Sequence, residues 1–254
     1  MTGRLGGSVA LVTGASSGIG GATGRALAAQ GAVVALLARR ADRLDELVKE
    51  IEAEGGRALA VPCDITDREA ATAAVRRTVD TFGRLDIVVN NAGSMLLGEF
   101  AGAPAELSDR MVAINVNGLL NVSRAALPYL VAAAAAEDGR GVADLVNVSS
   151  VAGRKAVAGG AVYALTKYGV VGLSEGLRQE LAGRRVRVTV VEPGAVQTEL
   201  ADHLAPEIRD RILTGMDYTP MDPGDVAEVI VFATTRGRNV AINELLVRPT
   251  GQLL

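Results

Sequence analysis

The sequence predicts one α/β domain built on a doubly wound, seven-stranded parallel sheet with helices on both faces. Short apolar runs alternate with longer segments of helical periodicity, and this alternation continues along all 254 residues. Unbroken apolar runs are typical of strands that are buried on both faces, as in a parallel sheet. Because no linker, repeat or shift in composition interrupts the pattern, we expect residues 1–254 to form a single domain.

The predicted elements follow one another in regular order. The strands cover residues 8–14, 32–38, 57–63, 85–91, 142–150, 186–194 and 243–249. A helix over residues 41–56 is indicated by apolar side chains at positions 44, 47, 48 and 51 and by the glycines at its end. Residues 195–218, after the sixth strand, are too many for an ordinary loop, so we expect a lid of short helices over a substrate.

The composition is that of a globular protein. Hydrophobic residues make up 49% of the chain and charged residues 22%, with a net charge of -3. The sequence has no basic block that would attract nucleic acid or an anionic membrane, and its longest apolar run is far shorter than the roughly 18 residues of a membrane span. One cysteine, Cys63, excludes an intrachain disulfide, and with a single histidine, His203, too few soft ligands exist for a zinc site. We therefore expect a cytoplasmic protein without a metal.

The first strand ends in the glycine loop TGASSGIG, which contains Gly14, Gly18 and Gly20. A strand that turns tightly into a helix, and a pyrophosphate that approaches backbone N–H groups, both favour residues without a Cβ. The loop therefore predicts dinucleotide binding in a Rossmann fold, and the alternative is an ordinary tight turn.

The end of the second strand indicates which dinucleotide. Ala38 stands where NAD-binding folds usually have an acidic residue, and Arg39 and Arg40 follow it. Guanidinium groups bind phosphate in a bidentate manner, whereas a carboxylate would repel the 2′-phosphate. We predict NADP(H) as the cofactor. The alternative is that the arginines, Arg40 above all, are solvated charges at the start of a helix.

Tyr163 and Lys167 are four residues apart in the segment AVYALTKYGVV and lie on one face of a predicted helix. A free phenol has a pKa of about 10, and a neighbouring ammonium group favours the phenolate. The pair is therefore a candidate for general acid–base chemistry, unless the helix is simply amphipathic.

Further motifs at strand ends complete the pattern. They are Asp64 in CDITD, NNAG at 90–93, Asn115 in INVNG, Ser150 thirteen residues before Tyr163, and PGAVQT at 193–198. With the glycine loop and the Tyr163–Lys167 pair, they make the sequence similar to the short-chain dehydrogenase/reductase family over essentially its whole length. Within that family the chain most resembles an NADP-dependent branch that includes clavulanic acid (clavaldehyde) dehydrogenase and reductases of small hydroxy acids, which implies a role in secondary metabolism.

The resemblance implies the site residues. The catalytic set is Asn115, Ser150, Tyr163 and Lys167. The cofactor-binding set is Gly14, Ser16, Ser17, Gly18, Ile19, Gly20, Arg39, Arg40, Asp64, Ile65, Asn91, Ala92, Gly93, Tyr163, Lys167, Pro193, Gly194, Val196 and Thr198. The substrate-binding set is Met95, Ser150, Arg154 and Tyr163, with Arg154 placed to pair with a substrate carboxylate. His203 is expected at the surface or in the pocket lining.

These sets imply a function. Tyr163 would be the general acid, Ser150 would bind the substrate oxygen, Lys167 would hold the nicotinamide ribose and Asn115 would anchor a water on the proton path. The resemblance thus implies NADPH-dependent, reversible reduction of a ketone or aldehyde. The alternatives are isomerase or dehydratase chemistry, or an NADP(H)-sensing protein without turnover. Apolar helix surfaces, together with the family's habit of pairing these helices, lead us to expect a homotetramer.

Overall fold

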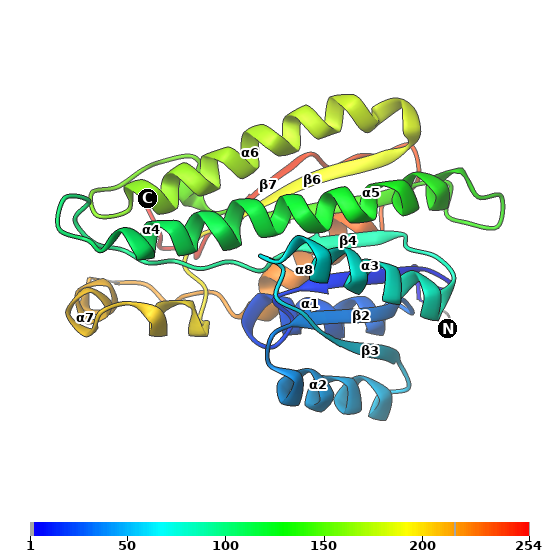
Figure 1. The fold of residues 1–254 in the computed structure, drawn as a ribbon, viewed down its shortest axis with the longest axis horizontal. Coiled ribbons are helices and arrows are strands. Elements are labelled where there is room, and N and C mark those ends of the chain that lie inside the picture. Colours follow the sequence, from blue (N-terminus) through cyan, green and yellow to red (C-terminus); the bar gives the residue numbers. More distant parts are fainter. Residues whose placement is uncertain (1–2, 216, 254) are drawn as a thin grey trace.

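The fold is a seven-stranded, wholly parallel sheet between two layers of helices (Figure 1). The computed structural model describes residues 3–215 and 217–253, apart from the side chains of His203 and of residues 211–213. The strands are β1 (Val9–Thr13), β2 (Val33–Ala38), β3 (Arg57–Pro62), β4 (Ile87–Asn90), β5 (Ala143–Val148), β6 (Val186–Pro193) and β7 (Glu244–Val247). Each falls inside a predicted strand, so the prediction of the sheet is confirmed.

The helices cover both faces of the sheet. The longer ones are α1 (Gly18–Ala29), α2 (Ala41–Ala53), α3 (Arg68–Phe82), α4 (Ala105–Val112), α5 (Leu119–Ala135), α6 (Ala161–Leu181), α7 (Pro206–Thr214) and α8 (Pro223–Thr234). The predicted helix at 41–56 ends three residues early, at Ala53. Short turns of helix are η2 (Val151–Gly153), η3 (Ala182–Arg184) and η4 (Glu199–His203). The predicted lid region thus contains η4 and α7, and α7 protrudes away from the sheet in Figure 1.

Alternation along each strand divides the core into two clusters. In β1, Val9 and Leu11 belong to the cluster that includes buried residues of α3 and α5. Ala10 and Val12, between them, belong to the cluster formed with α1, α2 and α8. Successive side chains of a strand point to opposite faces, so a strand with apolar residues at every position is buried on both.

The strand order is β3-β2-β1-β4-β5-β6-β7, so the sheet grows outward from β1 in one direction and from β4 in the other. In open α/β sheets, ligands bind at such a reversal, outside the carboxyl ends of the strands. The hydroxyl of Thr13, at the end of β1, accepts hydrogen bonds from the backbone N–H groups of Asn91 and Ala92 after β4, each with a length of 3.0 Å. These contacts join the two halves of the sheet at the edge where the glycine loop begins.

A π-helical turn, η1 (Ala113–Gly118), joins α4 and α5 into one helix from Ala105 to Ala135. Among the described residues, this is one helix that is long and apolar enough to cross a membrane by length and composition. The lengths of the unbroken apolar runs in the sequence did not predict it. Half of the most apolar 18-residue stretch of this helix is buried inside the domain. The helix contributes Val122, Ala126 and Leu130 to the core beneath the sheet, as expected of a core helix.

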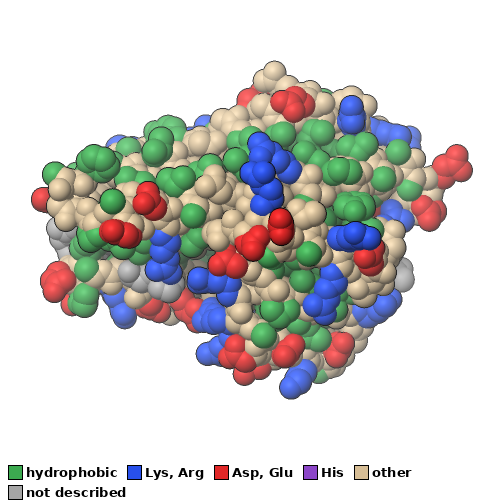
Figure 2. Space-filling model, viewed as in Figure 1, with side chains coloured by type: hydrophobic (Ala, Val, Ile, Leu, Met, Phe, Trp, Pro, Cys, Tyr) green, Lys and Arg blue, Asp and Glu red, His purple; other side chains and the backbone are tan. Residues whose placement is uncertain are grey.

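Part of α6 remains uncovered. Leu165 is 66% exposed and Tyr168 is 46% exposed. Figure 2 shows hydrophobic side chains over the upper part of the face that contains α4, α5 and α6 in Figure 1, with charged side chains more frequent around α2. The homotetramer remains a prediction.

A buried carboxylate fixes the start of the sheet. Asp86 is fully buried, and its carboxylate accepts a hydrogen bond from the Val9 N–H over 2.9 Å. Arg84 donates two more, over 2.8 and 2.9 Å. One side chain therefore satisfies the first N–H of β1 and neutralises the arginine beside it.

We expect Asp86→Asn to lower the free energy of unfolding by about 3 kcal/mol, because it leaves Arg84 with the 82% exposed Asp138, at 3.5 Å, as its remaining counter-charge among the described residues and places an amide N–H against at least one donor. The matched control is Asp80→Asn on α3, whose carboxylate is 67% exposed and 3.6 Å from Arg76. This control should change stability by less than about 0.5 kcal/mol. Urea unfolding measures both, and equal effects would contradict the role given to Asp86.

Candidate active site

A cavity of about 530 Å³ lies along the carboxyl edge of the sheet. Residues that follow β1, β2, β3, β4, β5 and β6 all line it, so segments far apart in the sequence meet there. Most of the residues predicted to bind a cofactor belong to this lining. They are Gly14, Ser16, Ser17, Gly18, Ile19, Arg39, Arg40, Asp64, Ile65, Asn91, Ala92, Gly93, Tyr163, Lys167, Pro193, Gly194, Val196 and Thr198.

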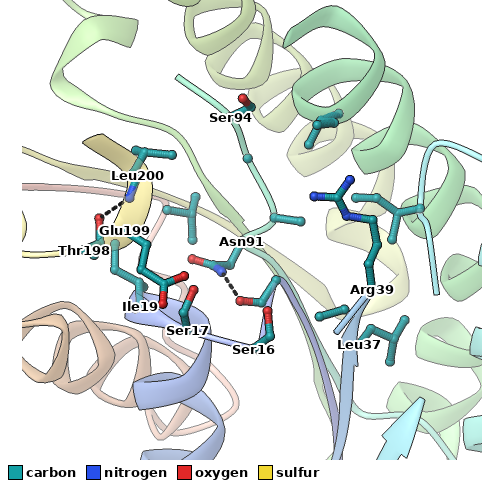
Figure 3. A pocket seen from close by; sticks show the side chains of 18 of the residues that line it. Ser16, Ser17, Ile19, Leu37, Arg39, Asn91, Ser94, Thr198, Glu199 and Leu200 are labelled. Carbon is teal, nitrogen blue, oxygen red and sulfur yellow. Dashed lines mark hydrogen bonds between the residues drawn. The ribbon is translucent and has the colours of Figure 1, made fainter. Parts of the chain in front are cut away.

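The glycine loop is shaped by close contacts that leave no space for side chains. Gly14 has φ of 66°, and a Cβ there would lie 2.8 Å from the Cα of Ala92. A Cβ at Gly20 would lie 2.3 Å from the carbonyl oxygen of Gly14, so Gly20 closes the turn and does not itself line the cavity. Asn91 fastens the loop, since its side chain donates to the carbonyl oxygen of Thr13 at 2.9 Å and to that of Gly14 at 3.5 Å, the second of which is drawn in Figure 3. The loop is thus held ready with its backbone facing the cavity.

Two arginines, Arg39 and Arg40, and two carboxylates, Asp64 and Glu199, line the end of the cavity formed by β2 and β3. Arg39 extends into it in Figure 3, and within the described part of the chain its side chain has no hydrogen-bond partner. Burial alone would raise the pKa of Asp64, but hydrogen bonds from the Thr66 N–H and hydroxyl and the charge of Arg39 lower it overall. Asp64 is therefore ionised at neutral pH, and Arg39 keeps donors available.

Arg40 immediately precedes α2 and its side chain is 43% exposed, as in the alternative considered from the sequence, but it also makes specific contacts. Its guanidinium donates to the Ser16 hydroxyl over 3.1 and 3.2 Å and to Glu199 over 2.8 Å. These contacts join the glycine loop, the end of β2 and the first turn of the predicted lid. Glu199 was not assigned to the site from the sequence. Its place directly after PGAVQT, a motif predicted to bind the cofactor, was the signal that could have found it.

Three predicted catalytic residues converge at the other end of the cavity. Tyr163 and Lys167 lie one turn apart on α6, with the Lys167 Nζ 5.7 Å from the centre of the Tyr163 ring. Ser150, directly after β5, accepts a hydrogen bond from the Ala152 N–H over 3.1 Å and hydrogen-bonds the Tyr163 phenol. The Lys167 ammonium donates to the Val148 carbonyl oxygen over 3.0 Å. Neighbouring Ser149 donates to the Lys167 carbonyl oxygen at 2.9 Å.

Burial dominates the proton affinities of this pair. It raises the pKa of the Tyr163 phenol, and only the hydrogen bond with Ser150 opposes that effect. It also lowers the pKa of Lys167 to about 8. The expectation that Lys167 pulls the phenol pKa down is therefore wrong for the protein by itself, because removing both groups from water favours their neutral forms.

Asn115 lies in the π-helical turn and does not line the cavity. Its amide oxygen accepts from the Ser94 N–H over 2.8 Å, and its amide nitrogen donates to the Ser94 carbonyl and the Thr166 hydroxyl. The side chain therefore holds the segment after β4 against α6, behind Lys167. Asn115 is therefore connected to the cavity through Ser94, which lines it.

The third wall follows β6. Thr198 accepts a hydrogen bond from the Leu200 N–H, and its methyl group lies 3.0 Å from where a Cβ of Gly18 would be. Gln252, in the C-terminal tail, accepts a hydrogen bond from the Ala195 N–H over 2.9 Å. Sequence reasoning missed Gln252, because nothing local in the tail connects it with residues 57 positions earlier.

Two residues predicted to bind the substrate, Arg154 and Met95, do not line the cavity. Arg154 does not line the cavity, and its guanidinium makes two hydrogen bonds with the buried Glu192, over 2.7 and 2.8 Å, and another with Glu244. Its assignment to a substrate carboxylate is therefore corrected. Met95 packs against Leu96, Met111 and Tyr163 and so supports the Tyr163 ring from outside the cavity lining. The side chain of His203 lies outside the described residues.

Comparison with known proteins decides the family. The profile described as short chain dehydrogenase matches residues 8–209. This chain belongs to the short-chain dehydrogenase family. Among its relatives, glycine betaine reductase ATRR of Emericella nidulans is 38% identical over 97% of this chain but only 19% of its own, so the chain spans about a fifth of that protein.

Solved short-chain dehydrogenases share the whole fold. One from Burkholderia cenocepacia, in complex with NADP, has a TM-score of 0.84 and 33% identity over 96% of this chain and 98% of that one. The 3-ketoacyl-(acyl-carrier-protein) reductase of Brucella melitensis, complexed with NADH, has a TM-score of 0.84 and 32% identity over the same shares of the two chains. The family named from the sequence motifs is thus confirmed.

The lowered pKa of Lys167 in this short-chain dehydrogenase should appear as pH-dependent stability. The folded pKa of about 8 lies below the value of about 10.4 in an unfolded chain. Between these values the unfolded state binds more protons, so the free energy of unfolding rises with pH. From pH 7 to pH 9, wild type should gain about 1 kcal/mol relative to Lys167→Met.

Urea unfolding of both proteins at pH 7, 8 and 9 measures this difference. Lys167→Gln serves as a second reference, because the pH dependence belongs to the lysine and not to its replacement. A difference that stays constant from pH 7 to pH 9 would show that the Lys167 ammonium is not destabilised by burial.

Proposed function

We propose that the protein is an NADPH-dependent oxidoreductase that reversibly reduces a ketone or aldehyde to the alcohol. The observation that carries the proposal is the buried Ser150–Tyr163–Lys167 cluster at one end of a cavity whose other end presents Arg39 and Arg40. A proton donor beside a hydroxyl that can hold an oxygen suits carbonyl reduction. The two guanidinium groups suit a phosphate on the adenosine side of a dinucleotide.

The cavity fits a dinucleotide. Its glycine loop has no space for side chains at Gly14 and Gly20 and turns its backbone to the cavity at the N-terminus of α1. Ala38 places no carboxylate at the end of β2, where the 2′-hydroxyl of NAD would be bound. Arg39 offers a guanidinium that makes no hydrogen bond with the described residues. The Burkholderia relative with NADP supports this reading, while the Brucella relative with NADH shows that the fold accepts either cofactor.

The residues divide the chemistry among them. Bound NADPH supplies the hydride that adds to the carbonyl carbon. Ser150 donates a hydrogen bond to the carbonyl oxygen, and Tyr163 transfers its phenolic proton to that oxygen as the negative charge develops. Lys167, whose ammonium donates to the Val148 carbonyl oxygen at the same end of the cavity, would hold the nicotinamide ribose. Since burial raises the phenol pKa, Tyr163 is protonated and ready to act as an acid at neutral pH.

The direct test is NADPH consumption by the purified protein with a panel of carbonyl compounds. The panel includes β-lactam aldehydes and 3-oxo acids, because the sequence resembles the branch that contains clavaldehyde dehydrogenase. Oxidation of NADPH with formation of the alcohol supports the proposal. Cofactor binding without turnover of any carbonyl would favour a sensing protein, and conversion of a substrate without net NADPH consumption would favour isomerase or dehydratase chemistry.

We expect Tyr163→Phe to bind NADPH nearly as well as wild type and to lose about 10²–10⁴ in kcat, because only the proton donor is removed. The matched control is Tyr168→Phe on the same helix, whose hydroxyl donates to the Arg154 carbonyl oxygen outside the cavity. This control should keep most of its activity. Steady-state kinetics and NADPH fluorescence titration separate the two readouts, and a Tyr163→Phe variant with more than half the wild-type kcat would remove Tyr163 from the mechanism.

We expect Arg39→Asp to weaken NADPH far more than NADH. A charge-assisted hydrogen bond contributes roughly 1.5–3 kcal/mol, or about 10- to 150-fold in affinity. The introduced carboxylate also repels the phosphate and can accept a hydrogen bond from a free 2′-hydroxyl. Arg76→Asp, at a 74% exposed side chain on α3, is the control for the change in net charge. Fluorescence titration that shows equal changes for both cofactors would contradict a 2′-phosphate site at Arg39.

A further inference from the structure

Glu199 reaches across the adenosine end of the cavity. It follows Thr198 directly and begins η4, the first turn of the predicted lid. Its carboxylate accepts a hydrogen bond from Arg40 over 2.8 Å, and a second comes from the Ser17 hydroxyl. Figure 3 shows the carboxylate pointing toward Ser17 and the glycine loop. Arg40, Ser17 and Glu199 all line the cavity in which we place the dinucleotide.

The carboxylate occupies a site built for an anion. The guanidinium of Arg40 is held in place from behind by the Ser16 hydroxyl and by the Ser16 carbonyl oxygen at 3.4 Å. The hydrogen bond with Arg40 is the main reason that the pKa of Glu199 is lowered, burial opposes it, and Ser17 and Arg43 contribute further to the lowering. Glu199 is therefore ionised at neutral pH, and the site already contains a negative charge that belongs to the protein.

A 2′-phosphate on the adenosine ribose would need the same donors. It would lie beside the end of β2, where Arg39 and Arg40 follow Ala38. A phosphate dianion and a carboxylate at one guanidinium repel each other, and each binds more weakly when the other is present. NADH has a hydroxyl at that position and makes no such demand on Arg40.

We infer that Glu199 determines cofactor specificity: its carboxylate competes with the 2′-phosphate of NADP(H) for Arg40 and so limits the affinity for the phosphorylated cofactor. This inference rests on the proposed function. The competition is of moderate strength, because Arg40 and Glu199 are 43% and 48% exposed and water screens the pair. Removal of the charge on Glu199 should therefore tighten NADPH by about two- to fivefold.

The test is Glu199→Gln, which keeps the shape and one acceptor but removes the charge. Fluorescence titration should show a lower Kd for NADPH and a nearly unchanged Kd for NADH. Calorimetry with adenosine 2′-monophosphate and adenosine 5′-monophosphate repeats the comparison on fragments that lack the nicotinamide. Only the 2′-phosphate should gain affinity, and the gain should shrink at high salt.

Two further variants sharpen the result. Glu207→Gln makes the same charge change at an exposed position of α7 outside the cavity and should alter neither cofactor's affinity. In an Arg40→Gln background the effect of Glu199→Gln should disappear, since a competitor matters only while the contested donor is present. This double-mutant cycle assigns the coupling to the Arg40–Glu199 pair and not to the general field of the lid.

Each other outcome overturns the inference. If Glu199→Gln weakens NADPH and NADH equally, Glu199 is a clasp that retains both cofactors. If it changes neither affinity, or if its gain persists with Arg40→Gln, no competition for Arg40 exists. Failure of the proposed function is distinguishable, because wild type would then bind neither NADPH nor adenosine 2′-monophosphate, or would bind NADPH and reduce no carbonyl compound.

Discussion

The parallel arrangement of the strands is the constraint on which the rest of the molecule depends. Parallel strands end at the same edge, so residues that follow six different strands line one cavity although most are far apart in the chain. A buried side-chain network keeps that edge in register. Asn90 of β4 donates to Asn147 of β5 and to Ser123 of α5, and Asn147 donates to Ser174 of α6. These bonds hold the two central strands against the helix that carries Tyr163.

Burial then sets the chemistry at the catalytic end. An ammonium and a phenol one turn apart would favour the charged pair in water, but here both lose hydration and both tend toward the neutral form. Ser150 is the group that draws the phenol the other way. The protein by itself therefore holds the Tyr163 phenol in its protonated form.

The features that could be predicted from the sequence are those determined by residues close together in the chain. The strands and the glycine loop were predictable, since apolar runs and close backbone contacts between near neighbours determine them. The role of Arg154 was not, because its partners Glu192 and Glu244 lie on β6 and β7, 38 and 90 residues away. The phenol pKa was predicted in the wrong direction for a similar reason: helical spacing showed the neighbouring Lys167, whereas the extent of burial depends on the complete fold.

The segment after β6 connects the two ends of the site. Within three residues, Thr198 packs against Gly18 of the glycine loop, Glu199 binds Arg40, and Leu200 lines the cavity. Its base is held by the tail, since Gln252 binds the Ala195 N–H and leaves no space for a side chain at Gly194. A lid that begins here is fixed at its base by uncharged contacts and at its first turn by one exposed ion pair. Because the ion pair is about half exposed, water weakens it, and it is the contact of this segment that the charge of a phosphorylated cofactor would affect most directly.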